Sequence, residues 1–152
     1  EGQVSDLPEL KKLFLDTITK ICNSDYDEEQ INAWIFDTKY NRNQQRWIDI
    51  LEKQFVLVAQ NENEIVGFIT LESGNYIDLL YVHKNYQRQG IANSLYDHIE
   101  KAAKQQNQSL LTSNVSKTAR AFFEKVGFVV TKKQTVVRQN VELINFTMTK
   151  II

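Results

Sequence analysis

The sequence predicts a single mixed α/β domain that contains an antiparallel meander. Three observations lead to this prediction. Residues 1–53 place apolar side chains at helical spacing, and from residue 54 onward short runs of branched and aromatic residues follow. The later elements alternate helix, strand and helix before two final strands, an order that fits neither a doubly wound fold nor a barrel. A length of 152 residues suits one domain, so we expect one domain over residues 1–152.

The composition excludes several classes of protein. The net charge is −1, so no overall field favours nucleic acid or an anionic membrane as a partner. Cys22 is the single cysteine, so no intrachain disulfide can form, and with only His83 and His98 as histidines we expect no metal centre. We find no signal peptide and no apolar run that could span a bilayer, and we therefore expect a cytoplasmic protein. The chain begins at Glu1 and not at Met, so a few residues, and a first strand with them, could be missing.

Three helices are expected in the first third of the chain. Pro8 lies in the first turn of the first helix, a position where its missing N–H costs nothing. Ser24 or Asp27 can cap the second helix. The third is short and covers residues 46–53.

Three strands follow at hairpin spacing and predict an antiparallel meander. Polar turns separate them, and Gly67 in the second strand marks a bulge or a close approach of another backbone. The strands cover residues 54–60, 65–71 and 76–82.

A helix, a strand, a second helix and a hairpin complete the domain. Ser116 caps the second of these helices and Gly127 ends it. The last strand could be a dimer edge if it is unpaired, so a homodimer is possible. The expected ranges are 90–106 and 117–126 for the helices, 110–115 for the strand, and 128–137 and 141–149 for the hairpin.

The stretch from Tyr76 to Ser94 reads as a buried strand, a polar loop and the first turn of a helix. The first backbone N–H groups of a helix have no partner within it and point outward at its positive end. Gly90 lets the backbone approach an anion, and Arg88 adds a fixed positive charge. The pattern is that of a phosphate site, or else of an ordinary strand–loop–helix connection. Neither G-x-x-x-x-G-K-[ST] nor G-x-G-x-x-G is present.

Two motifs resemble those of the GNAT superfamily of N-acetyltransferases. Residues 87–92, Gln-Arg-Gln-Gly-Ile-Ala, fit the pattern [QR]-x-x-G-x-[GA] of the family's motif A. Residues 116–128 end in FFEKVGF and resemble a later motif that follows motif A in the family. The order of elements is similar to the GNAT fold across essentially the whole chain, and the resemblance implies a central, mostly antiparallel sheet with helices on both of its faces. The chain also looks like a bacterial subgroup of uncharacterised acetyltransferases, so the resemblance does not reveal the acceptor.

The resemblance implies acetyl-coenzyme A as cosubstrate, no metal, and direct transfer of acetyl to an amine of a small molecule or peptide. Backbone N–H groups of residues 88–92 would hold the pyrophosphate, and pantetheine would lie between the strands 76–82 and 110–115. A backbone N–H near Tyr81 or Val82 would stabilise the oxyanion. The cofactor-binding residues implied in this way are Leu80, Tyr81, Val82, Gln87, Arg88, Gln89, Gly90, Ile91, Ala92, Asn93, Asn114, Ser116, Phe122 and Phe123.

Two residues depart from the family's pattern. Ser116 stands where the family usually has asparagine, and it can still cap the helix and bond to pantetheine. Phe123 stands where the family often has the tyrosine that protonates the departing thiolate. Tyr81, Tyr96 or water would then supply the proton, or the thiolate would leave unaided.

Asp78, Tyr81 and Glu72 are the candidate catalytic residues. Asp78 lies on the strand before motif A, where GNAT enzymes often place an acid, and burial among apolar neighbours would make it a useful base. The alternative is a structural acid bonded to backbone or to an arginine. Glu72 ends the preceding strand and is the reserve candidate, although a solvated strand end is the favoured explanation.

The acceptor would lie under the first three helices. Trp34 and Trp47 could wall a pocket there or fill the core. The acidic cluster at residues 25–29 could attract a cationic amine, or it could satisfy the dipole of the second helix.

Two other functions remain open at this point. Phe123 encourages the idea of a non-catalytic acyl-coenzyme A sensor on the same fold. A phosphate-binding regulatory domain without any link to coenzyme A is the other alternative.

Overall fold

Six strands form one sheet, in the order β1-β2-β3-β4-β6-β5, in the computed structural model, which describes all of residues 1–152. All neighbouring strands are antiparallel except β3 and β4, which confirms the predicted mostly antiparallel sheet. The strands are β1 (Phe55–Asn61), β2 (Glu64–Glu72), β3 (Tyr76–Val82), β4 (Leu110–Ser116), β5 (Val129–Arg138) and β6 (Val141–Ile151).

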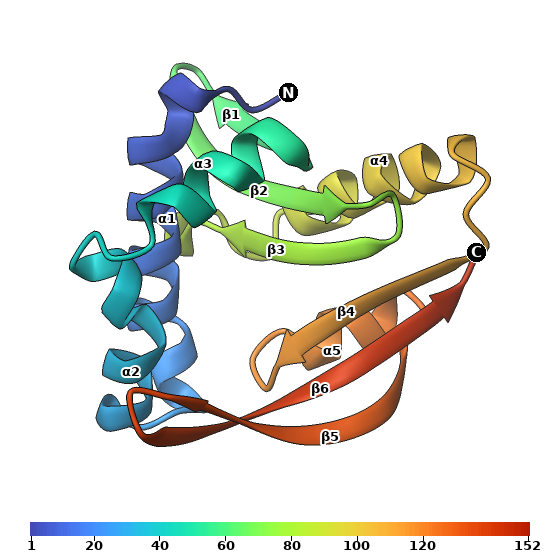
Figure 1. Cartoon of the computed structure of the whole chain (residues 1–152). Coiled ribbons are helices and arrows are strands. Elements are labelled where there is room, and N and C mark those ends of the chain that lie inside the picture. The colour runs from blue at the N-terminus through green and yellow to red at the C-terminus, as the bar shows by residue number, and fades with distance from the viewer.

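Helices cover both faces of the sheet, as predicted (Figure 1). The first three pack on one face, and the last two pack on the other. Asp27 accepts a hydrogen bond from the amide of Gln30 at 2.8 Å, so it is the predicted cap of the second helix. The helices are α1 (Leu7–Lys20), α2 (Glu28–Lys39), α3 (Gln44–Lys53), α4 (Ile91–Gln105) and α5 (Arg120–Lys125), with short 3-10 turns η1 (Val4–Asp6), η2 (Cys22–Ser24) and η3 (Lys84–Tyr86).

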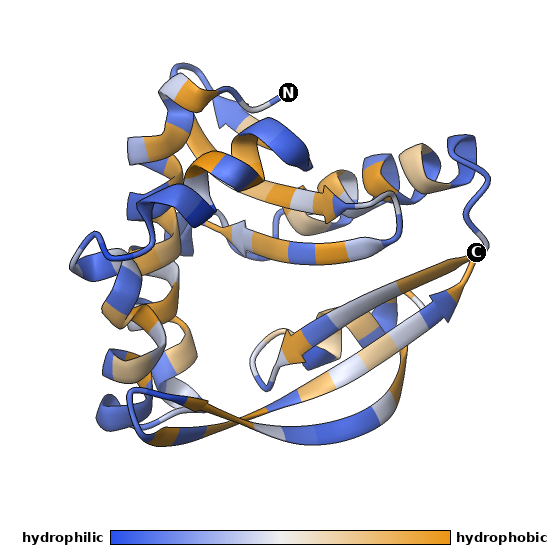
Figure 2. Ribbon diagram, in the orientation of Figure 1, coloured by the Kyte–Doolittle hydropathy of each residue, from blue (hydrophilic) through white to orange (hydrophobic).

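The sheet separates two apolar cores. Phe68 and Ile69 are both fully buried, but they belong to different cores because successive side chains of a strand point to opposite faces. The interior strand β2 is therefore apolar on both sides and appears almost continuously orange in Figure 2. The core with Phe68 holds Trp47 and the apolar faces of α1–α3, and the core with Ile69 holds Ile99 of α4.

The sheet opens between β3 and β4. These strands are paired only at Tyr76–Thr112 and Ile77–Ser113, whereas β4 and β6 are paired along the whole of β4. Beyond Ile77 the two parallel strands diverge toward their carboxyl ends (Figure 1). The Tyr26 hydroxyl braces the open end: it donates to the carbonyl of Ile144 at 2.6 Å and accepts from the amide of Lys117 at 2.9 Å.

Gly67 shows both features expected of it. The register of β1 and β2 shifts beside it, because Ala59 pairs with Gly67 but Gln60 pairs with Ile65. A Cβ at Gly67 would lie 3.2 Å from Cγ2 of Ile91 and 3.3 Å from the carbonyl oxygen of Tyr81. A larger residue would therefore push the first turn of α4 away from the sheet.

Two expectations about the second half of the chain are wrong. Helix α5 begins at Arg120 and not at 117, because the amide of Ala119 donates to Oγ of Ser116 in a turn before the helix. The last strand, β6, is paired on both sides, by β4 and β5, and so cannot be the dimer edge. The edge strands are β1 and, in this half of the chain, β5, where Lys132 and Lys133 disfavour pairing with another strand.

None of the helices is both long enough and apolar enough to cross a membrane. No three histidine, cysteine or acidic side chains come together in an arrangement that could hold a metal ion.

Candidate functional site

Two cavities lie at the opening between β3 and β4, and they meet at Tyr81 and Ser116, which line both. The cavity beside the loop that enters α4, here the loop cavity, measures about 430 Å³. The cavity beneath α1, α2 and α3, here the aromatic cavity, measures about 550 Å³. Molecules in the two cavities would therefore approach each other at the carboxyl end of β3.

The wall of the loop cavity beside α4 is made of backbone. Arg88 and Gly90 both have left-handed backbone, with φ of 60° and 82°. The first bond within the helix runs from the amide of Ser94 to the carbonyl of Gly90, so the amides of residues 91–93 have no partner inside α4. A Cβ at Gly90 would have no atom within 4 Å. The space in front of Gly90 is open, and the helix N-terminus and Arg88 make it suitable for an anion.

Gln87 fixes the loop to the end of β3. Its side-chain amide donates to the carbonyl of Val82. The residue thus holds the entrance of α4 against the strand that forms the opposite side of the loop cavity.

The edge of β3 adds free backbone donors. The amide of His83 donates to the carbonyl of Val66 at 2.7 Å, and the amide of Leu79 donates to Oγ1 of Thr70 at 3.1 Å. The N–H groups of Leu79 and of His83, just after β3, therefore point toward β2. By the alternation of a strand, Leu80 and Val82 direct theirs toward the gap left by β4. Of the two oxyanion donors expected, only Val82 faces the opening.

Eleven of the fourteen expected cofactor-binding residues line the loop cavity. Gln89 is exposed outside it, and Asn114 lines the aromatic cavity instead. Phe123 is only 3% exposed and packs edge-on against Phe128, so Phe122 forms the wall in its place. The eleven are Leu80, Tyr81, Val82, Gln87, Arg88, Gly90, Ile91, Ala92, Asn93, Ser116 and Phe122.

Sequence reasoning missed the wall of the loop cavity that comes from the first helix. Thr17 and Ile21, one helical turn apart, and Cys22 line it. Their spacing matched the core face of α1, and nothing local distinguished them from core residues. Lys125 of α5 lines the same cavity and was also missed, because at a helix end it reads as a solvated charge.

The aromatic cavity contains both kinds of aromatic residue considered from the sequence. Trp47 and Tyr26 are only 2% and 4% exposed and fill the core. Trp34, Tyr76 and Tyr81 are half-buried and line the cavity. Trp34 thus forms part of the wall of the aromatic cavity, whereas Trp47 belongs to the hydrophobic core.

Asp78 lies in the aromatic cavity with an arginine beside it. Its carboxylate is 3.1 Å from a guanidinium nitrogen of Arg46, and it accepts a hydrogen bond from Nε2 of Gln54 at 2.8 Å. Only 11% of the Asp78 side chain is exposed. Its neighbours are therefore polar, as in the structural alternative, yet the group faces the cavity. Glu72 is exposed at the end of β2 and lines neither cavity.

The tyrosine hydroxyls differ in what they can do. Burial raises the pKa of Tyr81 far above its usual value, so its hydroxyl stays protonated and can donate a hydrogen bond. Burial, and then the charge of Asp78, also raise the pKa of Tyr76. Tyr96 lines neither cavity, and its hydroxyl donates to Oε1 of Glu100 at 2.8 Å. The structure therefore brings Tyr81, and not Tyr96, to the opening.

Asn145 is a further polar residue of the aromatic cavity. It lies on β6 directly opposite Ser116 of β4, next to the point where the cavities meet. Its Oδ1 is buried, and no protein group donates to it. A ligand N–H in this cavity would satisfy it.

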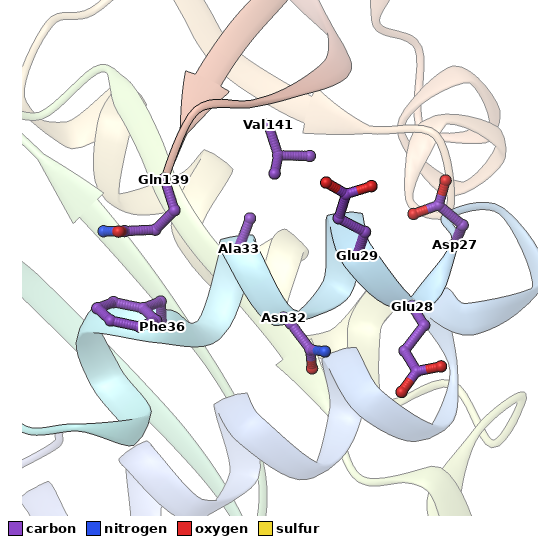
Figure 3. Close-up of a pocket in the computed structure, with 8 residues that line it drawn as sticks. All are labelled: Asp27, Glu28, Glu29, Asn32, Ala33, Phe36, Gln139 and Val141. Carbon is purple, nitrogen blue, oxygen red and sulfur yellow. The ribbon is translucent and has the colours of Figure 1, made fainter.

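A separate hollow lies between α2 and the β5–β6 turn. Figure 3 shows Glu29 on the side of α2 that faces Val141, whereas Glu28 and Asn32 point the other way. Asp27 caps α2, and the carboxylate of Asp25 accepts from the Thr118 hydroxyl at 2.8 Å. These two acids have structural partners, which favours the helix-terminus interpretation of the acidic cluster.

Comparisons with known proteins agree with this architecture. The family model described as acetyltransferase (GNAT) domain matches residues 22–150. YafP of Escherichia coli K12, an uncharacterised N-acetyltransferase, is 34% identical over 146 residues, which cover 96% of this chain and 90% of that protein.

Solved structures show the same fold. A GCN5-related N-acetyltransferase from Rhodopseudomonas palustris superposes with a TM-score of 0.91 at 31% identity, over 99% of this chain and 92% of that one. The PaiA N-acetyltransferase from Thermoplasma acidophilum, solved in complex with coenzyme A, gives a TM-score of 0.78 at 19% identity, over 99% and 96% of the two chains. At this lower identity the second likeness shows the fold alone.

Proposed function

Since the chain belongs to the GNAT acetyltransferase family, we propose that its loop cavity holds acetyl-coenzyme A and that its aromatic cavity holds the acceptor amine. The protein is an N-acetyltransferase, and each of the two cavities would bind one of its two substrates. The observation that carries this proposal is that the cavities meet at Tyr81 and Ser116, where a donor and an acceptor would be in reach of each other.

The residues of the loop cavity suit coenzyme A. No acidic side chain lines the cavity, and Arg88 and Lys125 supply positive charge. The free amides at the start of α4 and the open space before Gly90 suit a pyrophosphate. The N–H groups of Leu80 and Val82 suit the amides of a pantetheine arm. When bound, acetyl-coenzyme A supplies an acetyl thioester.

Val82 is the proposed oxyanion donor. Its amide faces the opening, and the Gln87 side chain bonds to the carbonyl on the other side of the same Cα, so the backbone that follows this amide is held before any ligand arrives. A fixed donor needs no reorganisation when negative charge develops on an oxygen next to it.

Asp78 is the proposed base, and Tyr81 is the proposed hydrogen-bond donor to the leaving group. Asp78 would attract the acceptor ammonium and receive its proton, directly or through water, with Arg46 and Gln54 holding the carboxylate in place. Tyr81 stays protonated because of burial, so its hydroxyl would donate a hydrogen bond to the departing thiolate and stabilise it, a role for which Phe123 is unsuited. Asn145 Oδ1 would accept an N–H of the amine and so orient its lone pair toward the opening. Glu72 remains the reserve base and is disfavoured by its position outside both cavities.

We expect this reaction to take place in the cytoplasm, where acyl-coenzyme A is found. The acceptor is an amine of a small molecule or peptide, and a screen of amines would identify it.

The test is titration of the purified protein with acetyl-coenzyme A, followed by a screen of amines for release of free thiol. Binding together with amine-dependent thiol release would support the proposal. Binding with no thiol release from a broad set of amines would favour a non-catalytic acyl-coenzyme A module. Binding of inorganic phosphate but not of coenzyme A would favour a phosphate-binding domain.

A further inference from the structure

Thr17 and Thr19 lie two residues apart on α1, but their hydroxyl groups differ in hydrogen bonding. Thr19 Oγ1 donates back to the carbonyl of Leu15 at 2.8 Å, the usual arrangement for threonine within a helix. Thr17 makes no such bond. Its Oγ1 is buried and has no hydrogen-bond partner in the protein, although the residue is only 7% exposed.

A buried hydroxyl without a partner destabilises the protein that carries it. A helical threonine can avoid this by bonding to its own helix, as Thr19 does. Thr17 instead lines the loop cavity, with its hydroxyl buried and unpartnered. The geometry therefore points to a ligand group as its partner.

The surroundings of Thr17 indicate what kind of group this is. The rest of the wall from α1 and the turn after it consists of Ile21 and Cys22, and it contributes no charge. The cations of the cavity, Arg88 and Lys125, come from the loop before α4 and from α5. A phosphate would be placed with the cations, whereas a neutral polar group suits an uncharged hydroxyl in an apolar wall.

We propose that Oγ1 of Thr17 hydrogen-bonds to an amide of the pantetheine arm of the bound acyl-coenzyme A. This inference rests on the proposed function of the loop cavity. A hydroxyl can both donate and accept, so it suits either the carbonyl or the N–H of an amide. With β3 supplying backbone donors from the other side, the arm is held between α1 and β3, and α1 becomes part of the cofactor site.

The experiment compares Thr17→Val, Thr17→Ser and the control Thr19→Val with the unmodified protein. Each is titrated calorimetrically with coenzyme A and with adenosine 3′,5′-bisphosphate, a fragment that lacks the pantetheine arm. The thermal midpoint of each ligand-free protein is measured alongside. Valine preserves the shape of threonine and removes only the hydrogen-bonding group.

We expect Thr17→Val to weaken coenzyme A binding about 3- to 10-fold, because one hydrogen bond contributes about this much to affinity. Its affinity for adenosine 3′,5′-bisphosphate should be unchanged. The ligand-free Thr17→Val protein should melt at the same temperature or higher, because the unpartnered hydroxyl is gone. Thr17→Ser should bind coenzyme A like the unmodified protein. Thr19→Val should lower the thermal midpoint and leave both affinities unchanged.

Three results would overturn the inference. One is unchanged coenzyme A affinity in Thr17→Val, and another is an equal loss for the fragment and for coenzyme A. The third is a fall in thermal midpoint as large as that of Thr19→Val, which would show that Thr17 has a structural partner such as a bound water. Failure of the unmodified protein to bind coenzyme A would be a different outcome, since it would remove the proposed function itself.

Discussion

The two cavities differ in whether backbone or side chains supply their polar groups. The loop cavity takes its polar groups mostly from backbone: the amides at the start of α4, the left-handed residues before it and the edge of β3. The aromatic cavity takes its polar groups from side chains on several elements, including Arg46 on α3, Asp78 on β3 and Asn145 on β6. A backbone site tolerates many side chains and recognises one common ligand. Single substitutions can change the ligand specificity of a site made of side chains, which suits an acceptor that differs between relatives.

This comparison predicts that a substitution on one side will leave binding on the other side intact. The variants below test that separation and are ordered from the largest expected effect to the smallest.

Replacing Gly90 with leucine should have the largest effect. The leucine side chain would occupy the open space in front of the free amides of α4, and we expect acetyl-coenzyme A affinity to fall by about 100-fold or more, ~2.7 kcal/mol. Left-handed backbone at a leucine should also cost about 1–2 kcal/mol of stability. Gly74→Leu is the control, because Gly74 has φ of 79° but lies in the β2–β3 turn away from both cavities. Calorimetric titration should show normal affinity for the control, and equal losses in both variants would contradict the anion-site proposal.

Replacing Asp78 with asparagine should act on the other cavity. We expect kcat/KM for the acceptor to fall on the order of 100-fold and the pH–rate profile to flatten, while the Kd for acetyl-coenzyme A stays the same. Asp49→Asn is the control, since Asp49 pairs with Lys53 on the surface of α3. A folded Asp78→Asn protein with an unaltered pH profile would reduce Asp78 to a structural role.

Replacing Asn145 with alanine should have a smaller effect on the same side. Loss of one hydrogen bond to the amine should raise KM for the acceptor by about 10-fold, with the affinity for acetyl-coenzyme A unchanged. Thr149→Ala, on the same face of β6 but outside the cavity, serves as the control. Steady-state kinetics measure this KM, and an unchanged value would show that Asn145 does not bind the acceptor.

Glu100 offers a test outside both cavities. Hydrogen bonding from Lys150, at 2.6 Å, lowers the pKa of Glu100 and ties α4 to β6. A carboxyl whose folded pKa is lowered stabilises the fold above its unfolded pKa, about 4.3, and this contribution disappears as the pH falls through the folded pKa. Glu100→Gln should therefore reduce the free energy of unfolding by about 1 kcal/mol at pH 7 and by much less at pH 2.5, without altering either affinity.

Urea unfolding at the two pH values measures this difference. A deficit that is the same at both pH values would mean that Glu100 contributes through packing and not through its charge.

The same comparison explains which parts of the molecule could be predicted. Apolar periodicity placed the helices and strands, because a period of 3.6 or 2 follows from burying one face of a local segment. The loop cavity was largely predictable, since backbone sites need a particular local sequence such as that around Gly90. The wall from Thr17 was not, because the spacing that predicts a core helix face is the same whether the face meets core or ligand.

The aromatic cavity was less predictable for a related reason. Asp78 and Arg46 are 32 residues apart, and Asn145 meets Ser116 only through the pairing of β4 with β6. No local pattern records such contacts. The edge position of β5 was missed likewise, because strand order depends on the crossover from β4 through α5 and on which side of β4 the final hairpin joins.

The most direct test of the central claim is a map of backbone amide chemical shifts as the isotope-labelled protein is titrated with coenzyme A. The account predicts that the largest changes fall on Leu80, Val82 and the amides of residues 91–93, with little change in α2 and α3. Changes concentrated in the aromatic cavity, or in the hollow of Figure 3, would contradict the assignment of the loop cavity to the cofactor.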